Sequence, residues 1–438
     1  MTTNLPKRAA LLAAALFPAA TYATNGYQLI GVGAYQKSLA GAVTASPGSA
    51  MTAVSNPAGM ARIGRRTDFS MEAFMPSRSV DFEAMGGVTE QSAVGLYGIP
   101  ALGWSAPVAD GSNVYFGGGM FGTSGMGVDY ASTSMAPGYY TDPAAPTTFV
   151  ADPVSWEGYS NLSFWQMAPS LAWNVNQRYS IGLSLNIDYQ AVAFKQRVSA
   201  DSTGDGNANM VLQNFDLSRG ASGFGLGVGF GLLYDVTDSF TVGFNYKSKQ
   251  QFAPMEFQLG WGDISDGPGM EAPAGTYRLD LDFPQQAAIG MAFDATPALT
   301  ISADLKWIEW SDTMNRLAVE GPGGMSVPMN PGWEDQTIYA VGVAYALNDK
   351  VNLRAGYNYA KAPFGASEVS RNLILPAIVE THYTAGIDIA LNNHWQLALH
   401  YMQAPEKSMT APADDTMAPG SRISLSEHSF GANIGYRF

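Results

Sequence analysis

The sequence predicts an all-β protein, a 14-stranded antiparallel transmembrane β-barrel with an N-terminal hatch inside its lumen. Three observations support this prediction. Runs with an apolar side chain at every second residue recur along the chain, tight and long connections alternate between them, and the composition is rich in aromatics but poor in charge. Only 14% of the residues are charged, against about a quarter in soluble domains. Membrane barrel strands need apolar side chains only at alternate positions, so this combination is typical of that class.

The first 23 residues are typical of a secretory signal peptide. Lys7 and Arg8 form a short basic region, residues 9–17 are an apolar run, and residues 21–23 carry small side chains at the positions that a signal peptidase recognises. The run is too short to span a bilayer as a helix, which takes about 20 residues. We therefore expect residues 1–23 to be cleaved and the mature chain to be exported. A buried N-terminal helix is the alternative.

Residues 24–66 form the predicted hatch. The stretch 25–61 has a single charged residue, Lys37, and more than half of its residues are Gly, Ala, Ser or Thr. It shows neither the alternation of a strand nor an amphipathic helix, and Asn56-Pro57 is a turn signal near its end. The stretch is too apolar for a solvated tail and too irregular for a strand. We expect it to fill the inside of the barrel built by residues 67–438.

The clearest strand of that barrel is the C-terminal one. Apolar side chains stand at positions 430, 432, 434, 436 and 438, small or polar residues lie between them, and the chain ends on Phe438. Side chains of a strand point alternately to its two faces, so this run has one lipid-compatible and one polar face. A soluble edge strand is the alternative for this run alone. Fourteen candidates lie at 67–83, 97–108, 113–121, 161–175, 179–199, 222–235, 238–252, 276–294, 297–311, 335–347, 350–361, 380–391, 394–404 and 427–438.

The connections between these strands alternate in length along the chain. Six are tight turns, at 110–112, 176–178, 236–237, 295–296, 348–349 and 392–393. Seven are long, at 84–96, 122–160, 200–221, 253–275, 312–334, 362–379 and 405–426. Alternation places all tight turns at one end and all long loops at the other, as in outer-membrane barrels and unlike a soluble sandwich. About eight strands can be filled by side chains alone, so fourteen leave a lumen that is open or plugged.

Composition excludes several classes of protein. The absence of Cys excludes a disulfide scaffold and a thiol nucleophile, and no apolar segment is long enough for a helical membrane span. A net charge of −14 without a basic stripe argues against nucleic acid as a partner. No metal site and no cofactor are predicted. Asp201, Thr203, Asp205 and Asn207 have the spacing of half a calcium loop, but Leu212 stands where that loop needs Glu, so a solvated loop tip is the simpler interpretation.

Four features occur together in this chain: Gly26-Tyr27-Gln28-Leu29 at the mature start, the glycine-rich section 31–41, Asn56-Pro57-Ala58 before the first strand, and the segment 306–310. In kind and order they resemble the FadL-type long-chain fatty acid and hydrocarbon transporters of the Gram-negative outer membrane, and the first three resemble the N-terminal hatch of that family. The resemblance covers essentially the whole mature chain. It implies capture of a hydrophobic ligand by outer loops, an internal pocket above the hatch, a hatch that moves at residues 26–29, and an inward kink of the third strand. The ligand then leaves sideways into the membrane.

Two sequence features fit parts of this route. Gly117-Gly118-Gly119 in the third strand marks the expected lateral opening, since glycine inside a strand often marks a bend. A weak strand packed against bulky neighbours is the alternative. Trp156, Phe257 and Trp261 are apolar residues in predicted outer loops, where exposed patches usually mark a binding site. Their packing together as a loop core is equally compatible with the sequence.

A fatty acid needs a cation or several hydrogen-bond donors for its carboxylate, because an unpaired buried charge is costly. By alternation Lys247, Lys306 and Arg354 face inward, with His400 as a further donor, and Lys195 and Arg197 lie near an outer strand end. Each can instead pair with an acidic residue of the barrel interior. The expected partners are hydrophobic small molecules, with outer-membrane lipid and detergent-like amphiphiles, and we expect a monomer.

Long-chain fatty acids are the first expected substrate, and alkanes or aromatic hydrocarbons are the alternative. Three other classes stay open from the sequence: an outer-membrane enzyme, a general porin, and an adhesin or structural barrel. The enzyme is disfavoured because none of the four His lies in a recognisable nucleophile motif or in a paired acid–base cluster.

Overall fold

The computed structural model describes residues 25–137, 140–141, 149–150, 153–201 and 209–438. The predicted signal peptide, 1–23, and most of the calcium-like stretch, 202–207, lie outside the described residues. No helix in the described ranges is both long and apolar enough to cross a membrane. The helices are short: α2 (Gly33–Ser38), α3 (Thr52–Ser55), η1 (Pro57–Gly59), α4 (Met60–Ile63), η2 (Glu83–Met85), α5 (Ser311–Met314), η3 (Pro322–Gly324) and η4 (Ala366–Arg371).

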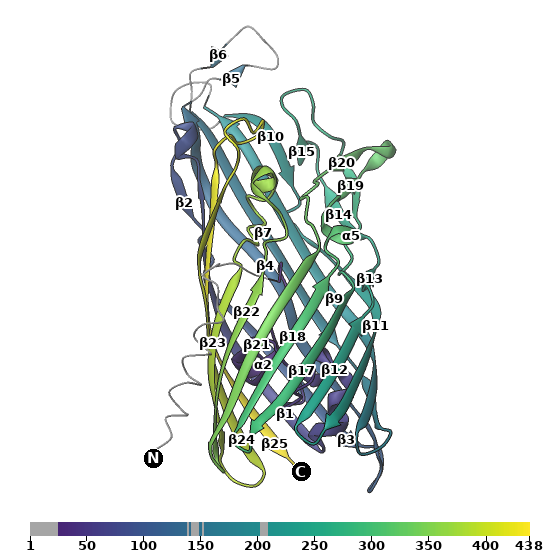
Figure 1. Ribbon diagram of the computed structural model, residues 1–438. Helices are drawn as coiled ribbons and strands as arrows, with labels where there is room; N and C mark the ends of the chain where they lie inside the picture. The colour runs from purple at the N-terminus through teal and green to yellow at the C-terminus, as the bar shows by residue number, and fades with distance from the viewer. Residues whose placement is uncertain (1–24, 138–139, 142–148, 151–152, 202–208) are drawn as a thin grey trace, which may run out of the picture.

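Fourteen antiparallel strands form one closed barrel, which confirms the predicted fold class (Figure 1). Each strand pairs with the next one along the chain, and the last pairs with the first from Arg66↔Arg437 to Asp81↔Arg422. The barrel strands are β1 (Arg66–Asp81), β3 (Tyr97–Pro107), β4 (Val114–Pro137), β7 (Pro153–Met167) with β8 (Ser170–Asn174), β9 (Tyr179–Ala200), β11 (Ala221–Thr237), β12 (Phe240–Lys247), β17 (Gln286–Thr296), β18 (Leu299–Ile308), β21 (Gln336–Asn348), β22 (Val351–Ala360), β23 (Thr381–Ala390), β24 (Trp395–Thr410) and β25 (Arg422–Arg437).

The two faces of β1 show why these sequences form a membrane barrel. Phe69 and Met71 point outward and are each 48% exposed, while Ser70 and Glu72 point inward and are buried. Apolar side chains thus face the position of the lipid, and polar side chains face the lumen, as a strand with period-2 alternation requires. The interior therefore offers hydrogen-bonding groups to whatever fills it.

Tight turns join the strands at the end where the C-terminus lies, and the long connections gather at the opposite end (Figure 1). The long connections contain the remaining strands. Four of these, β14 (Met255–Leu259), β16 (Gly275–Leu279), β19 (Ala318–Glu320) and β20 (Ser326–Pro328), form a separate sheet. The others are β2 (Thr89–Gln91), β5 (Tyr140–Thr141), β6 (Phe149–Val150), β10 (Met210–Asp216), β13 (Gln251–Phe252) and β15 (Ile264–Ser265).

Several predicted boundaries were wrong. β24 runs to Thr410 and β25 begins at Arg422, so the loop expected at 405–426 is shorter. The barrel strand expected at 276–294 begins at Gln286, because 275–279 belongs to the separate sheet, and the strand expected at 238–252 ends at Lys247. The long loop expected at 122–160 consists largely of extensions of β4 and β7, which pair with each other. Three register shifts interrupt that pairing, between Gly122/Ser124, Tyr130/Thr133 and Ser134/Ala136. Each inserted residue reverses the inward–outward alternation, which removes the signal that identifies a strand in sequence.

The N-terminal segment, residues 25–65, packs against inward-facing glycines on many strands. A methyl group at Gly243 would stand 2.3 Å from the backbone oxygen of Thr44, and one at Gly356 would stand 2.6 Å from the carbonyl carbon of Leu39. The same close approach occurs at Gly103, Gly182, Gly231 and Gly386, on β3, β9, β11 and β23. Figure 1 shows α2 within the outline of the barrel, nearer the end with the tight turns. Glycine at these positions lets the segment approach the strand backbone.

We predict that Gly243→Val destabilises the protein by about 1–3 kcal/mol, because the added methyl groups overlap the segment at Thr44. Ala303→Val is the matched control, since Ala303 alternates with the buried Ser302 and Asp304 and so faces outward on β18. Urea unfolding in lipid vesicles measures the stability of each variant. Proteolysis of the N-terminal segment measures how firmly that segment is packed on the wall. Equal stability of the two variants would contradict close packing of the segment on the wall.

Candidate functional site

The wall of the barrel is interrupted beside β4. Pairing of β3 with β4 ends at Ala101↔Phe121, although β3 continues to Tyr97 and β4 continues to Pro137. Residues 122–127 of β4 therefore have no β3 partner in the described chain. The first register shift between β4 and β7 falls at this same place, between Gly122 and Ser124. We call the interval between residues 94–100 and 122–127 the wall gap.

Three residues of the N-terminal segment pair with the free edge of β4. Leu29 N–H donates to the carbonyl of Thr123 at 3.0 Å, and Gly125 N–H donates to the carbonyl of Tyr27 at 3.0 Å. Gln28 and Ser124 form an antiparallel bridge between these two bonds. Residues 27–29 thus replace part of the missing β3 pairing, and they do so from the segment that packs on the inner wall.

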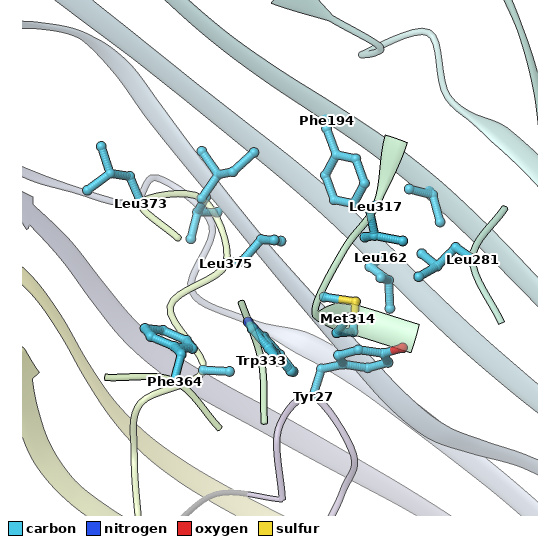
Figure 2. Close-up of a cluster of buried hydrophobic side chains, with 14 of the residues drawn as sticks. Tyr27, Leu162, Phe194, Leu281, Met314, Leu317, Trp333, Phe364, Leu373 and Leu375 are labelled. Atoms are coloured by element: carbon cyan, nitrogen blue, oxygen red, sulfur yellow. The ribbon is translucent and has the colours of Figure 1, made fainter. Parts of the chain in front are cut away.

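Aromatic side chains hold Tyr27 in this position. Its ring centroid lies 4.6 Å from that of Trp310, 5.7 Å from that of Phe283 and 5.8 Å from that of Trp333. Figure 2 shows Tyr27 beside Met314 and Trp333 within a large buried cluster. Gly26 has a φ of 64°, and a Cβ there would stand 2.7 Å from the Trp310 ring, so only glycine fits before Tyr27. Burial raises the pKa of the Tyr27 hydroxyl, which therefore stays neutral.

An apolar cavity of about 150 Å³ lies at the wall gap. Tyr27 and Leu29 line it from the N-terminal segment, Phe74 and Tyr97 from the wall, and Met126 from the free part of β4. Pro376 and Ala377 also line it, and they belong to the stretch 372–379, which is buried throughout. The cavity is thus lined by several parts of the chain that are distant in sequence.

A second cavity, of about 80 Å³, has a mixed lining whose polar side chains include Lys247, Lys306 and Asp304, and we call it the polar cavity. Leu29 lines both cavities, and Gln28 lines the polar one. Lys306 Nζ donates to Gln28 Oε1 at 2.6 Å, and Lys247 Nζ donates to Gln166 Oε1 at 2.9 Å. The polar cavity therefore brings together two of the predicted ligand-binding cations, and residues 28–29 separate it from the apolar cavity.

The sequence matches the family described as outer membrane protein transport protein (OMPP1/FadL/TodX) over residues 10–438. The chain belongs to this family. It is 22% identical to outer membrane protein P1 of Haemophilus influenzae over 319 residues, which make up 64% of this chain and 66% of that protein. It thus spans slightly less than two thirds of the length of that relative.

Solved structures of the FadL/TodX type share the fold. The P. putida toluene transporter TodX has a TM-score of 0.73 and 20% identity, with 94% of this chain and 99% of that chain covered. A Pseudomonas aeruginosa FadL homologue has a TM-score of 0.67 and 18% identity, covering 94% and 100%. These findings confirm the resemblance to the family. The protein is thus a member of an outer membrane transport protein family.

Other predicted ligand-binding residues of this FadL/TodX chain have internal partners. Arg354 forms an ion pair with Asp388, and its guanidinium lies 4.4 Å from the ring centroid of Tyr35 in the N-terminal segment. His400 Nε2 lies 4.0 Å from Glu72 Oε1 and 3.5 Å from Ser429 Oγ. In the described chain neither Arg354 nor His400 lines the apolar or the polar cavity. Their role in ligand binding stays a prediction. At the outer strand end Lys195 pairs with Glu157 at 2.6 Å.

The three apolar residues expected in outer loops are divided between core and surface. Trp156 lies on β7 and Phe257 on β14, and each is 2% exposed within the large buried cluster. Trp261 is 69% exposed. Trp156 is buried because β7 extends beyond its predicted start and packs its ring against Phe82 and Tyr130. Among the described residues that line the apolar cavity, none of these three is found.

Gly117-Gly118-Gly119 lies next to the wall gap. These glycines pair with Ser105, Trp104 and Gly103 of β3, respectively. The part of β4 that has no β3 partner begins three residues after Gly119. A Cβ at Gly118 would stand 2.2 Å from the carbonyl oxygen of Ala168, at the interruption between β7 and β8. The glycines therefore permit a close approach of neighbouring strands where β4 changes its pairing.

Asn56-Pro57-Ala58 ties the N-terminal segment to the wall. Asn56 Oδ1 accepts from Ala58 N–H at 3.2 Å, and Asn56 Nδ2 donates to the carbonyls of Thr44 at 2.7 Å and Leu232 at 3.2 Å. A buried amide that satisfies both ends in this way fixes the local backbone.

Sequence reasoning missed the stretch 372–379, which was assigned to an outer loop, and Arg78, which faces inward on β1. The apolar run Leu373-Ile374-Leu375 within a long connection could have indicated that 372–379 is buried. Alternation along β1 could have indicated that Arg78 faces inward. Across the described ranges no group of three or more His, Cys, Asp or Glu is placed to hold a metal ion.

Lys37 and Glu72 join α2 of the FadL/TodX chain to β1 as a buried ion pair. Lys37 Nζ lies 3.0 Å from Glu72 Oε1, and the two side chains are 1% and 3% exposed. We predict that Lys37→Met alone costs about 3–5 kcal/mol, since it leaves the Glu72 charge buried and unpaired. Lys37→Met combined with Glu72→Leu is expected to recover most of that loss. Urea unfolding in lipid vesicles tests this; a double variant as unstable as the single one would contradict it.

Proposed function

We propose that the protein takes up compact apolar molecules, such as monoaromatic hydrocarbons, and releases them sideways into the membrane through the wall gap. The observation that carries this proposal is the apolar cavity, which lies where β4 has lost its β3 partner. A ligand in this cavity is next to an interruption of the wall and need not cross the packed N-terminal segment. Lateral release also keeps an apolar molecule out of water.

The size of the apolar cavity supports a compact ligand. Its volume is about 150 Å³, and an apolar cavity of about that volume in another protein binds benzene. Tyr27, Phe74 and Tyr97 present ring surfaces to such a molecule. A long-chain fatty acid is several times longer than one aromatic ring, so it needs additional space.

The outer part of the route begins at exposed apolar residues. Trp261 is 69% exposed and Met270 is 52% exposed, both in the connection between β12 and β17. Such residues at the outer end suit the first capture of a hydrophobic ligand, and the flexible Met side chain adapts to different shapes. The stretch 372–379 then lies between the outer end and the apolar cavity, so we propose that it moves when a ligand enters.

Residues 24–66 act in this proposal as the hatch, and residues 26–29 act as its gate. The pairing of 27–29 with 123–125 closes the free edge of β4 from inside and separates the apolar from the polar cavity. Contacts of the N-terminal segment with six or more wall glycines support a plugged barrel over an open general porin. Swelling assays that detect uptake of small sugars would favour the porin.

Long-chain fatty acids are the second candidate, supported by the polar cavity. Lys247 and Lys306 line it on the far side of Gln28, so displacement of residues 28–29 would join an apolar space to two ammonium groups. An ammonium group is a suitable partner for a carboxylate that enters a buried site.

Ligand binding separates the two candidates. We predict that toluene changes the tryptophan fluorescence saturably, because Trp165 lines the apolar cavity, and that Met126→Trp weakens toluene binding by filling that cavity. The control is Ala303→Val on the lipid-facing side. Oleate binding that Lys306→Met lowers at least tenfold would instead support the fatty acid. Absence of binding for both ligands would contradict both candidates.

The gate makes a separate prediction. Leu29→Pro removes the N–H that donates to Thr123, so we expect faster uptake of labelled toluene by cells without loss of barrel assembly. Leu29→Met keeps the N–H and a similar volume and serves as the control. Heat-modifiable migration on gels reports the folded barrel. Unchanged uptake, or loss of the folded barrel, would show that residues 26–29 are structural and do not act as a gate.

A further inference from the structure

Arg78 lies at the outer end of the wall gap. It is on β1 between Phe74, the last β1 residue that pairs with β3, and Ser79, the first that pairs with β2. Arg78 points inward, is 5% exposed, and lines the apolar cavity.

The Arg78 guanidinium bridges the two edges of the wall gap. Its Nη1 donates to the carbonyl of Gly127 on β4 and, at 3.2 Å, to the hydroxyl of Tyr97. Its Nη2 donates to the carbonyl of Val94. The guanidinium also lies 5.5 Å from the ring centroid of Tyr97. One side chain thus holds Gly127 on one edge and residues 94–97 on the other.

These contacts span an interval in which the backbones do not pair. On the side of Arg78 toward the tight turns, residues 122–127 have no β3 partner. On the side toward the long connections, Ala93 N–H donates to the carbonyl of Asp129 at 2.8 Å, and this bond joins the two edges again. Arg78 therefore stands where the wall gap ends. A guanidinium is suited to this place because its planar fork reaches several carbonyls at once.

Stability alone is a poor explanation for this arginine. It forms no ion pair within the described chain, and its Nε has no hydrogen-bond partner there. Glu427 lines the same cavity but pairs with His382 at 3.4 Å. A buried charge that carbonyl and hydroxyl oxygens alone solvate is costly to keep, so an apolar residue would serve a purely structural role better.

We propose that Arg78 determines the size limit of lateral release, because its bonds across the wall gap set the width through which a ligand leaves the apolar cavity. This inference rests on the proposed lateral route. Arg78 acts as a positioning residue for Gly127 and for residues 94–97. Loosening it widens the exit and admits bulkier molecules, while the cavity itself keeps its other walls.

The width of the wall gap can be measured directly, because the chain contains no Cys. Leu96→Cys and Asn161→Cys place two spin labels at exposed positions on either side, since Asn161 pairs with Gly127 across β4 and β7. In Arg78→Met we expect a longer and broader distance distribution between the labels than in the wild-type protein. Arg78→Lys, which keeps the charge but not the fork, is expected to lie between them. An unchanged distance in Arg78→Met overturns the inference.

Uptake by cells provides the second readout. The ratio of naphthalene to toluene uptake is expected to rise several-fold in Arg78→Met and less in Arg78→Lys. Arg422→Met is the matched control, because Arg422 pairs with Asp81 across β25 and β1 at the same outer end, where the strands are continuous. A wider gap with an unchanged uptake ratio overturns the inference. If the proposed function itself fails, the wild-type protein binds neither toluene nor naphthalene, and the inference falls with it. If the wild-type protein binds toluene but the label distance is unchanged in Arg78→Met, only the inference about Arg78 is overturned.

Discussion

An irregular chain inside a barrel must find a hydrogen-bond partner for each of its buried backbone groups, and the interior of this protein depends on that requirement. Asp304 on β18 accepts from the N–H groups of Val43 and Thr44 at 3.0 and 2.9 Å. Asp68 on β1 accepts from Ala50 N–H at 2.8 Å. Inward-facing glycines complete the fit by letting the segment approach the wall. Much of the polarity of the lumen thus serves to hold the N-terminal segment in place.

The same requirement explains the geometry at the wall gap. Once β3 separates from β4, the free β4 edge has donors and acceptors without a strand partner. Residues 27–29 supply two of the missing bonds from one side, and Arg78 covers the carbonyl of Gly127. Neither replacement is continuous sheet, so this part of the wall is joined by fewer bonds than the rest. An apolar cavity beside it is therefore well placed for a transport step.

Alternation along the strands predicted part of the candidate site and missed the rest. It correctly places Lys247 and Lys306 inside the barrel, because both lie in regular stretches of β12 and β18. It does not tell which inward cation is paired within the barrel, so it could not distinguish Arg354, which contacts Asp388 and Tyr35, from the two lysines that line the polar cavity. Bulges in β4 removed the period-2 pattern of its extension and made that extension resemble a loop. Trp156 on the paired extension of β7 was therefore assigned to an outer loop, and it lies in the core.

The fold class, the strand number and the gathering of the tight turns at one end could all be predicted from the amino-acid sequence. Those features depend on side-chain alternation and turn residues, which act over a few neighbouring positions. Three contacts are visible only in the folded chain: residues 27–29 pair with β4, 372–379 packs against the apolar cavity, and Arg78 reaches Gly127. These contacts join segments distant in the chain through backbone groups that every residue carries. They therefore leave no local pattern in the sequence, and they appear only when the closed barrel brings the segments together.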